Sequence, residues 1–289
     1  MKLDKETKEA VKRFQRNEIT EYHVYSYLAK MIKGPNSKIL QGIAKDEKNH
    51  YERWKKYSKE EVKPSRCKML WYSFLAKTAG FTFAVRLMEK GEERAQKAYR
   101  KAVAKLPEAK DIQKQENKHE KYLINMLNEE RLDYISSIIL GLNDALVELT
   151  GAIAGLTFAF QKTNLISIAA LVTGIAASLS MAASQYLAKK SEKSQKNPLK
   201  AATYTGIAYI SAVLILVLPF FVLHNPYYAL AWTLSNAILI IAFFSYFVSV
   251  TRDSSFKRGF LEMAVLSMGV AAISFVIGLV LRKTLGVGI

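Results

Sequence analysis

Residues 139–160 read ILGLNDALVELTGAIAGLTFAF, an apolar run interrupted by two acidic residues, Asp144 and Glu148. Five apolar stretches follow one another in this half of the chain: Tyr134–Phe160, Leu165–Ala188, Ala201–Leu223, Pro226–Val250 and Phe260–Leu281. Each exceeds the roughly 20 residues that a helix needs to cross the hydrocarbon core of a bilayer. The sequence therefore predicts an integral membrane protein with five transmembrane helices.

Charge is divided unevenly along the 289 residues. Residues 1–134 hold 31 of the 42 basic residues and 20 of the 25 acidic residues. The mean hydropathy of +0.03 is thus an average over a charged half and an apolar half. We expect two domains, a cytoplasmic domain at 1–133 that is surrounded by water and a membrane domain at 134–289 that is surrounded by lipid.

The composition also excludes several classes of protein. A single cysteine, Cys67, excludes an internal disulfide and a cysteine-rich metal site. The first 20 residues contain no apolar core of a secretory signal. The net charge of +17 is spread through helical patterns without a nucleic-acid motif, so we predict no nucleic-acid partner.

Basic residues in the loops predict the orientation in the membrane. Lys189–Lys200 follows the second span and Arg252–Arg258 follows the fourth, whereas the two loops on the other side carry only Lys162. Basic loops stay on the cytoplasmic side. We therefore expect the cytoplasmic membrane as location, with the N-terminus in the cytoplasm and the C-terminus outside.

Amphipathic segments separated by short turns predict an all-α fold for the first half. Four helices are expected: Asp4–Lys33, Ser37–Ser58, Cys67–Lys105 and Glu108–Glu130. Short turns between such helices favour an antiparallel four-helix bundle.

Two of these helices repeat one motif, Glu47-x-x-His50 and Glu116-x-x-His119. The spacing puts a carboxylate and an imidazole on the same helix face. The other two helices supply one further candidate each, Glu18 and Glu92. One Glu from each of two helices plus Glu-x-x-His from the other two is the ligand set of a di-iron carboxylate site. We therefore predict a bound pair of iron ions, with manganese as the alternative.

Residues 17–29, NEITEYHVYSYLA, extend this pattern. With the four-helix ligand set, they resemble the first helix of the rubrerythrin-type branch of the ferritin-like superfamily. The resemblance allows Glu21 and Glu89 as additional ligands, and the alternative is that both are solvated helix charges.

Three acidic residues lie inside predicted spans: Asp144, Glu148 and Glu262. Charged residues at this depth are costly and normally face a pathway or a partner. Met181 in the second span offers a thioether that suits a transition metal, although packing is the simpler explanation for it. The alternative for the carboxylates is a protonated or hydrogen-bonded pair between helices.

Residues 139–160 and 178–193, the latter reading SLSMAASQYLAKKSEK, resemble the vacuolar iron transporter family. The resemblance implies a homodimer that exchanges Fe²⁺ or Mn²⁺ for protons, with Asp144, Glu148, Met181 and, more loosely, Glu262 on the pathway. The chain departs from eukaryotic members, because about a dozen basic residues replace their glutamate-rich insert between spans 2 and 3. A ferritin-like domain fused to such a membrane domain is similar to prokaryotic membrane-bound ferritins.

Three hypotheses follow. The leading one is export of Fe²⁺, with Mn²⁺ as a second candidate, in which the bundle captures or senses the metal. The alternative is an enzyme, a membrane-anchored di-iron ferroxidase or peroxide-reducing protein. The third is a purely structural bundle that mediates dimerisation without metal.

Overall fold

The computed structural model describes residues 4–103, 106–126, 134–192 and 197–285, without the side chains of residues 92, 95–103, 120–121, 124–126 and 285. The described residues form helices and no strand, which confirms the all-α fold. The chain divides into two compact units, which we call unit 1 (Met1–Glu129) and unit 2 (Glu130–Ile289).

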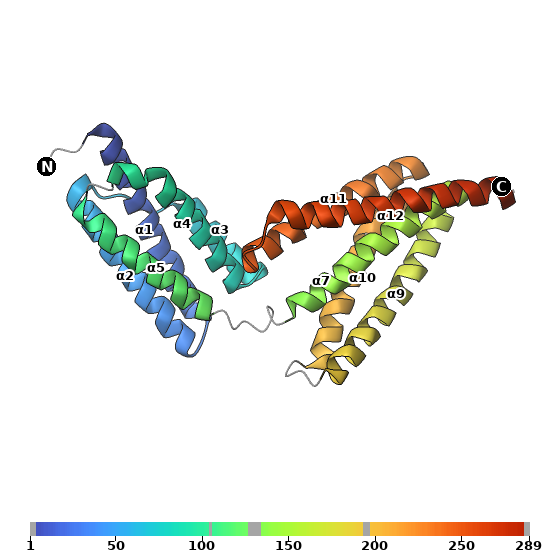
Figure 1. Cartoon of the computed structure of the whole chain (residues 1–289), viewed down its shortest axis with the longest axis horizontal. Coiled ribbons are helices and arrows are strands. Elements are labelled where there is room, and N and C mark those ends of the chain that lie inside the picture. Colours follow the sequence, from blue (N-terminus) through green and yellow to red (C-terminus); the bar gives the residue numbers. More distant parts are fainter. Residues whose placement is uncertain (1–3, 104–105, 127–133, 193–196, 286–289) are drawn as a thin grey trace. The chain divides into compact units, whose positions relative to one another are not determined.

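The described residues of unit 1 form five helices (Figure 1): α1 (Lys5–Met31), α2 (Pro35–Ser58), α3 (Arg66–Thr78), α4 (Phe81–Val103) and α5 (Pro107–Met126). The side chain of Asp4 caps α1 by accepting a hydrogen bond from the amide of Thr7. Helices α1 and α2 pack along their length, α4 contacts α1, and α5 contacts α2 and α4. These four helices surround the buried side chains of the unit.

The sequence prediction of one helix over Cys67–Lys105 is wrong. Two helices, α3 and α4, occupy that range, and the break lies at Ala79 and Gly80. Gly80 has φ +100°, a backbone conformation that side-chain-bearing residues rarely adopt. Helix α3 consequently leaves the line of α4 and packs against α1 and α4 from outside.

In unit 2, the part of the chain that the structure describes forms five helices that are long and apolar enough to cross a membrane: Ile135–Phe160, Thr163–Ser191, Pro198–Val222, Pro226–Thr251 and Phe256–Thr284. The first consists of α7 (Ile135–Asp144), a π-helical segment η1 (Ala145–Leu149) and α8 (Thr150–Phe160). The others are α9 (Thr163–Ser191), α10 (Pro198–Val222), α11 (Pro226–Thr251) and α12 (Phe256–Leu285) (Figure 1). These helices confirm the prediction of an integral membrane protein.

Small residues bring α8 and α12 into close contact. A Cβ placed on Gly278 would lie 2.3 Å from the backbone oxygen of Gly155, and one on Gly155 would lie 3.1 Å from that of Ser274. Membrane helices associate through such small-residue faces because the bilayer supplies no hydrophobic force between them. The first span is therefore held tightly against the fifth.

Candidate metal centre

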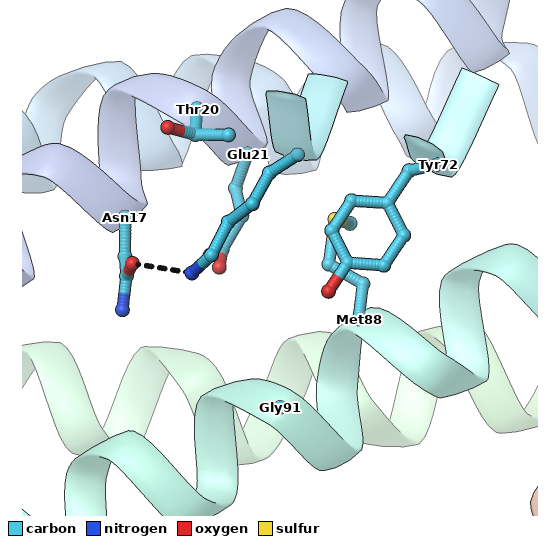
Figure 2. Close-up of a pocket in the computed structure, with 7 residues that line it drawn as sticks. Asn17, Thr20, Glu21, Tyr72, Met88 and Gly91 are labelled. Carbon is cyan, nitrogen blue, oxygen red and sulfur yellow. Dashed lines mark hydrogen bonds between the residues drawn. The ribbon is translucent and has the colours of Figure 1, made fainter. Parts of the chain in front are cut away.

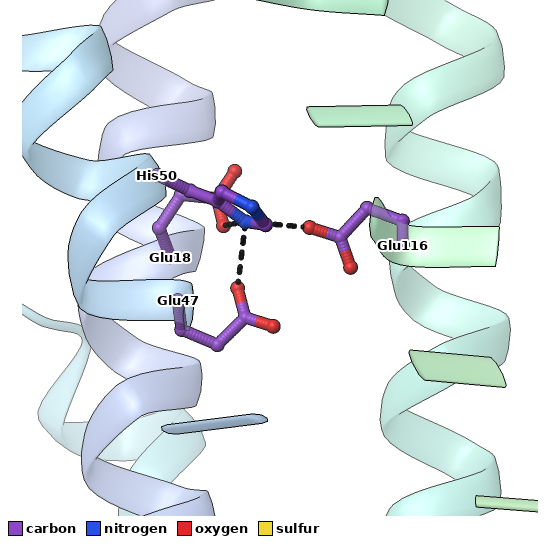
Figure 3. Close-up of side chains that lie close together, drawn as sticks. All are labelled: Glu18, Glu47, His50 and Glu116. Atoms are coloured by element: carbon purple, nitrogen blue, oxygen red, sulfur yellow. Dashed lines mark ion pairs between the residues drawn. The ribbon is translucent and has the colours of Figure 1, made fainter. Parts of the chain in front are cut away.

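Carboxylate and imidazole groups from three helices converge inside unit 1. Glu18 comes from α1, Glu47 and His50 from α2, and Glu116 from α5 (Figure 3). All four are buried, and each offers one ligand atom within 4.8 Å of those of the others. The i, i+3 spacing on α2 lets one turn of helix contribute two donors.

His119 of α5 joins this cluster through shared carboxylates. Its Nδ1 lies 3.2 Å from Glu47 Oε1 and 3.3 Å from Glu116 Oε2. His50 Nδ1 lies 3.5 Å from Glu47 Oε2 and 2.8 Å from Glu116 Oε1. Each glutamate thus presents one oxygen to each histidine. Two carboxylates shared between two imidazoles form a compact set of metal-ligating groups.

The outer nitrogen of each histidine is held by the other helix. His50 Nε2 lies 2.7 Å from Gln115 Oε1, and His119 Nε2 lies 3.1 Å from Asp46 Oδ2. Asp46 and Gln115 each precede the glutamate of their own motif. Such contacts orient an imidazole so that its other nitrogen is available to a metal. The sequence analysis did not identify Asp46 and Gln115 as partners of the histidines, because each of these contacts joins a residue of α2 to a residue of α5.

Burial and neighbouring charges have opposite effects on the pKa values of Glu47, His50 and His119. Burial lowers the pKa of His119, but the neighbouring Glu116 and Glu47 outweigh burial and raise this pKa to about 11. The pKa of His50 is also raised by its glutamate neighbours despite burial. Burial opposes ionisation of Glu47, yet the two neighbouring histidines lower its pKa to about 2. The carboxylates thus favour the protonated form of both imidazoles, and a metal ion bound here would compete with protons for their nitrogens.

The residues of the cluster fit a bound metal ion. His50 Nδ1 lies within 3.5 Å of both Glu47 Oε2 and Glu116 Oε1, and these three buried atoms contact one another without a hydrogen bond of good geometry. Buried polar atoms normally have well-placed partners, and a metal ion bound among them would supply one. Mixed carboxylate and imidazole donors suit Fe²⁺ or Mn²⁺. Trp54 Nε1 donates to Glu18 Oε1 at 3.0 Å and fixes that carboxylate.

The further candidates Glu21 and Glu89 are placed beside this centre. Burial raises the pKa of Glu21 well above its ordinary value and that of Glu89 to about 8, and Glu89 accepts a hydrogen bond from the Tyr25 hydroxyl. Glu21 lines a cavity of about 40 Å³ together with Tyr72 and Met88 (Figure 2). Glu21 is thus buried rather than a solvated helix charge, and its ligand role stays a prediction. The side chain of Glu92 lies outside the described residues.

The intramembrane carboxylates lie at an irregular point of the first span. Asp144 ends α7, and Glu148 lies within the π-helical segment η1. Such segments are rare and frequently occur at functional sites. The Tyr209 hydroxyl of α10 donates to Glu148 Oε2 at 3.0 Å, while the rest of the Glu148 side chain is exposed. The sequence predicted neither the π-helical segment nor the contribution of Tyr209.

The remaining pathway candidates differ in their surroundings. Met181 on α9 is half-buried and packs against the core of unit 2. Glu262 lies near the start of α12, where it is exposed and its Oε1 is 2.8 Å from Arg258 Nε. This ion pair gives Glu262 a partner on its own helix.

Comparison with known proteins matches unit 2 to a protein family. The model of the VIT family matches residues 135–197 and 191–279, which together span all but the last few residues of the five predicted membrane helices. No curated protein and no solved structure gave a match to the chain.

Proposed function

The chain belongs to the VIT family of membrane metal transporters, and we propose that it exports Fe²⁺ from the cytosol in exchange for protons, with Mn²⁺ as a second substrate. One observation carries the proposal: a single chain combines a buried Glu/His cluster in unit 1 with carboxylates inside a membrane span of unit 2. The basic loops after the second and fourth spans support a cytoplasmic position for unit 1.

Asp144 and Glu148 are the proposed metal ligands of the transport path. Carboxylate oxygens bind Fe²⁺ and Mn²⁺, and the uncoordinated carboxylates would accept protons on the return step. The hydrogen bond from Tyr209 fixes one oxygen of Glu148 and leaves the other for the ion. The buried Asn143 Oδ1 has no hydrogen bond among the described residues and supports a polar path beside Asp144.

A homodimer is part of the proposal. Glu148 is exposed on a helix that spans the membrane, where an acidic side chain facing lipid is costly. A second copy would cover this carboxylate and could supply further ligands. The exposed position of Glu148 therefore favours a path at the interface between two copies.

Unit 1 is proposed to capture the metal before transport. Two ions held by Glu18, Glu47, His50, Glu116 and His119 would form the bound pool of this unit. Two iron ions would supply redox chemistry toward O₂ or peroxide when bound. The chain's own residues bind the ions through carboxylates, orient the imidazoles through Asp46 and Gln115, and exclude water by burial.

Transport into proteoliposomes tests this proposal. We expect Fe²⁺ uptake by the full chain to require a pH gradient and to be lost in Asp144→Ala. Glu192→Ala is the matched control, because Glu192 lies exposed after the second span and pairs with Lys189. Uptake by Asp144→Ala at the wild-type rate would overturn the assignment.

The bridging geometry also favours a second candidate, a ferroxidase or peroxide-reducing enzyme. Glu47 and Glu116 each present an oxygen to both histidines, so the two carboxylates and two imidazoles would be close enough together to hold a pair of iron ions, which would supply redox chemistry when bound. Mixing the iron-loaded full chain with O₂ or peroxide and recording ferric absorbance tests this candidate. Fast turnover that persists in Asp144→Ala and is lost in Glu47→Ala would favour the enzyme over the transporter.

A further inference from the structure

Helix α3 presents an apolar face that no other described part of unit 1 covers. Leu70, Trp71 and Phe74 are 72%, 53% and 57% exposed, and the Trp71 and Phe74 rings stack with centroids 6.3 Å apart. Cys67 is also exposed and lies one turn before Leu70. These four residues follow an i, i+3, i+4, i+7 spacing, so they share one side of the helix, which we call the α3 outer face.

The opposite side of α3 explains why this face points outward. Leu75 and Ala76 are buried, and the helix packs on α1 and α4 through that side. Among the described residues of unit 1, only Met31 and Tyr122 are other large hydrophobic side chains with comparable exposure. The α3 outer face is therefore a concentrated patch and not part of a generally apolar surface.

Basic residues flank the patch. Helix α3 contains Arg66, Lys68 and Lys77 and no acidic residue, and all three basic side chains belong to exposed residues. Lys68 Nζ also donates to Asn17 Oδ1 at 3.2 Å, and this hydrogen bond holds the Lys68 side chain beside α1. A helix with Trp, Phe and Leu on one side and Lys and Arg at its borders is typical of segments that lie in the headgroup region of a membrane.

A short connection in the sequence joins unit 1 to the membrane-spanning unit 2. Only seven residues separate Met126, the last residue of α5, from Tyr134, which precedes the first span. A tether of this length spans at most ~28 Å at 3.3–3.6 Å per residue. Unit 1 is consequently held at a high effective concentration near the lipid surface.

We propose that the α3 outer face binds the anionic headgroup region of the bilayer, with Leu70, Trp71 and Phe74 inserted and the basic residues at the phosphates. The charge of α3 selects this occupant over a second copy of the chain. A two-fold interface on this face would bring Arg66, Lys68 and Lys77 of both copies together without acidic partners on the helix.

Cys67 allows a direct test, because it is the only cysteine of the chain and is exposed on this face. A nitroxide attached to Cys67 of the full chain is measured in vesicles of equal parts phosphatidylglycerol and phosphatidylcholine. The measured quantity is the ratio of the label's collision rate with O₂ to its collision rate with a water-soluble nickel complex. We expect this ratio to be severalfold higher for the Cys67 label than for a label on the cysteine of Asn49→Cys in a Cys67→Ser background. Asn49 is exposed on α2 and serves as the solvent reference.

Two sets of variants separate insertion from charge. The apolar variant Leu70→Ser/Trp71→Ser/Phe74→Ser and the charge variant Arg66→Glu/Lys77→Glu should both return the Cys67 label to the solvent reference. Lys38→Glu/Lys45→Glu changes the same charge on exposed residues of α2 and should leave the label inserted. All substituted residues are exposed, and far-UV circular dichroism checks that the helices remain.

Two results would overturn the proposal. A Cys67 label that is as accessible to the nickel complex as the Asn49 label in anionic vesicles shows that the face stays in water. Dipolar broadening between Cys67 labels of neighbouring chains shows that a second copy covers the face instead.

Discussion

Asp46 and Gln115 occupy equivalent positions in the two motifs, yet they differ in charge. Asp46 faces His119 Nε2 with a carboxylate, whereas Gln115 faces His50 Nε2 with a neutral amide oxygen. A carboxylate on the outer nitrogen makes an imidazole a more basic metal ligand. In the proposed pair of metal positions, the one that uses His119 should therefore bind more tightly than the one that uses His50.

Substituting Asp46→Asn tests this difference. The amide keeps the size of the side chain but removes its charge, so we expect metal affinity at one of two positions to fall by roughly 10–100-fold. Titration of the full chain with Co²⁺, followed by visible absorption, measures both steps. Glu52→Gln, an exposed acid on α2, is the control and should bind as the wild type does. Unchanged binding by Asp46→Asn would show that Asp46 has no influence on the centre.

At the scale of elements, Gly80 separates α3 from α4. Its φ of +100° strains any residue with a Cβ, so Gly80→Ala should lower stability by more than about 1 kcal/mol. Gly42→Ala is a matched control within α2, where a Cβ meets no atom within 4 Å and should stabilise by about 0.5–1 kcal/mol. Thermal melts of the two variants should therefore shift in opposite directions, and an unshifted Gly80→Ala would contradict the account.

Helical period and apolar length predicted most elements, but not their interruptions. Residues 67–105 contain no proline, and one glycine within a helical pattern is commonly tolerated, so the break at Gly80 gave no clear signal. The Glu-x-x-His spacing predicted the centre because its donors repeat within single helices. Tyr209 lies 61 residues after Glu148, and only the packing of α10 on the first span brings them together.

The π-helical segment η1 depends on a contact with α12. Ser267 Oγ donates to the backbone oxygen of Leu146 at 2.7 Å, and the Thr150 hydroxyl donates to the same oxygen. These donors satisfy a carbonyl that regular helix hydrogen bonding would otherwise use. The segment that carries Glu148 is thus stabilised by the fifth span.

Removing this donor should weaken transport without removing a carboxylate. We expect Ser267→Ala to cost about 1 kcal/mol of stability in the membrane domain and to reduce Fe²⁺ uptake, because the Glu148 side chain loses its fixed position. Ser211→Ala is the control, since Ser211 bonds within its own helix at Ile207. Uptake by both variants at the wild-type rate would show that η1 does not need Ser267.

At the scale of the whole molecule, the two units are joined by a short connection, and each contains its own acidic site. A capture function for unit 1 implies that its metal raises the supply of Fe²⁺ to the path rather than forming the path. Saturating Fe²⁺ should then make unit 1 dispensable, whereas limiting Fe²⁺ should reveal it. The structural alternative, a bundle used only for dimerisation, implies that unit 1 binds no metal at any concentration.

Glu116→Gln separates these possibilities, because it keeps the side-chain size and removes one bridging charge. We expect the full-length variant to lose metal from unit 1, to keep the maximal rate of Fe²⁺ uptake, and to need a severalfold higher Fe²⁺ concentration for half that rate. Asp144→Ala should do the reverse, keeping the unit 1 metal and losing uptake. Asp111→Asn, an exposed acid on the same helix, should change neither. Identical uptake by wild type and Glu116→Gln at every Fe²⁺ concentration, despite loss of the metal, would refute capture, because unit 1 would then bind metal without feeding the path.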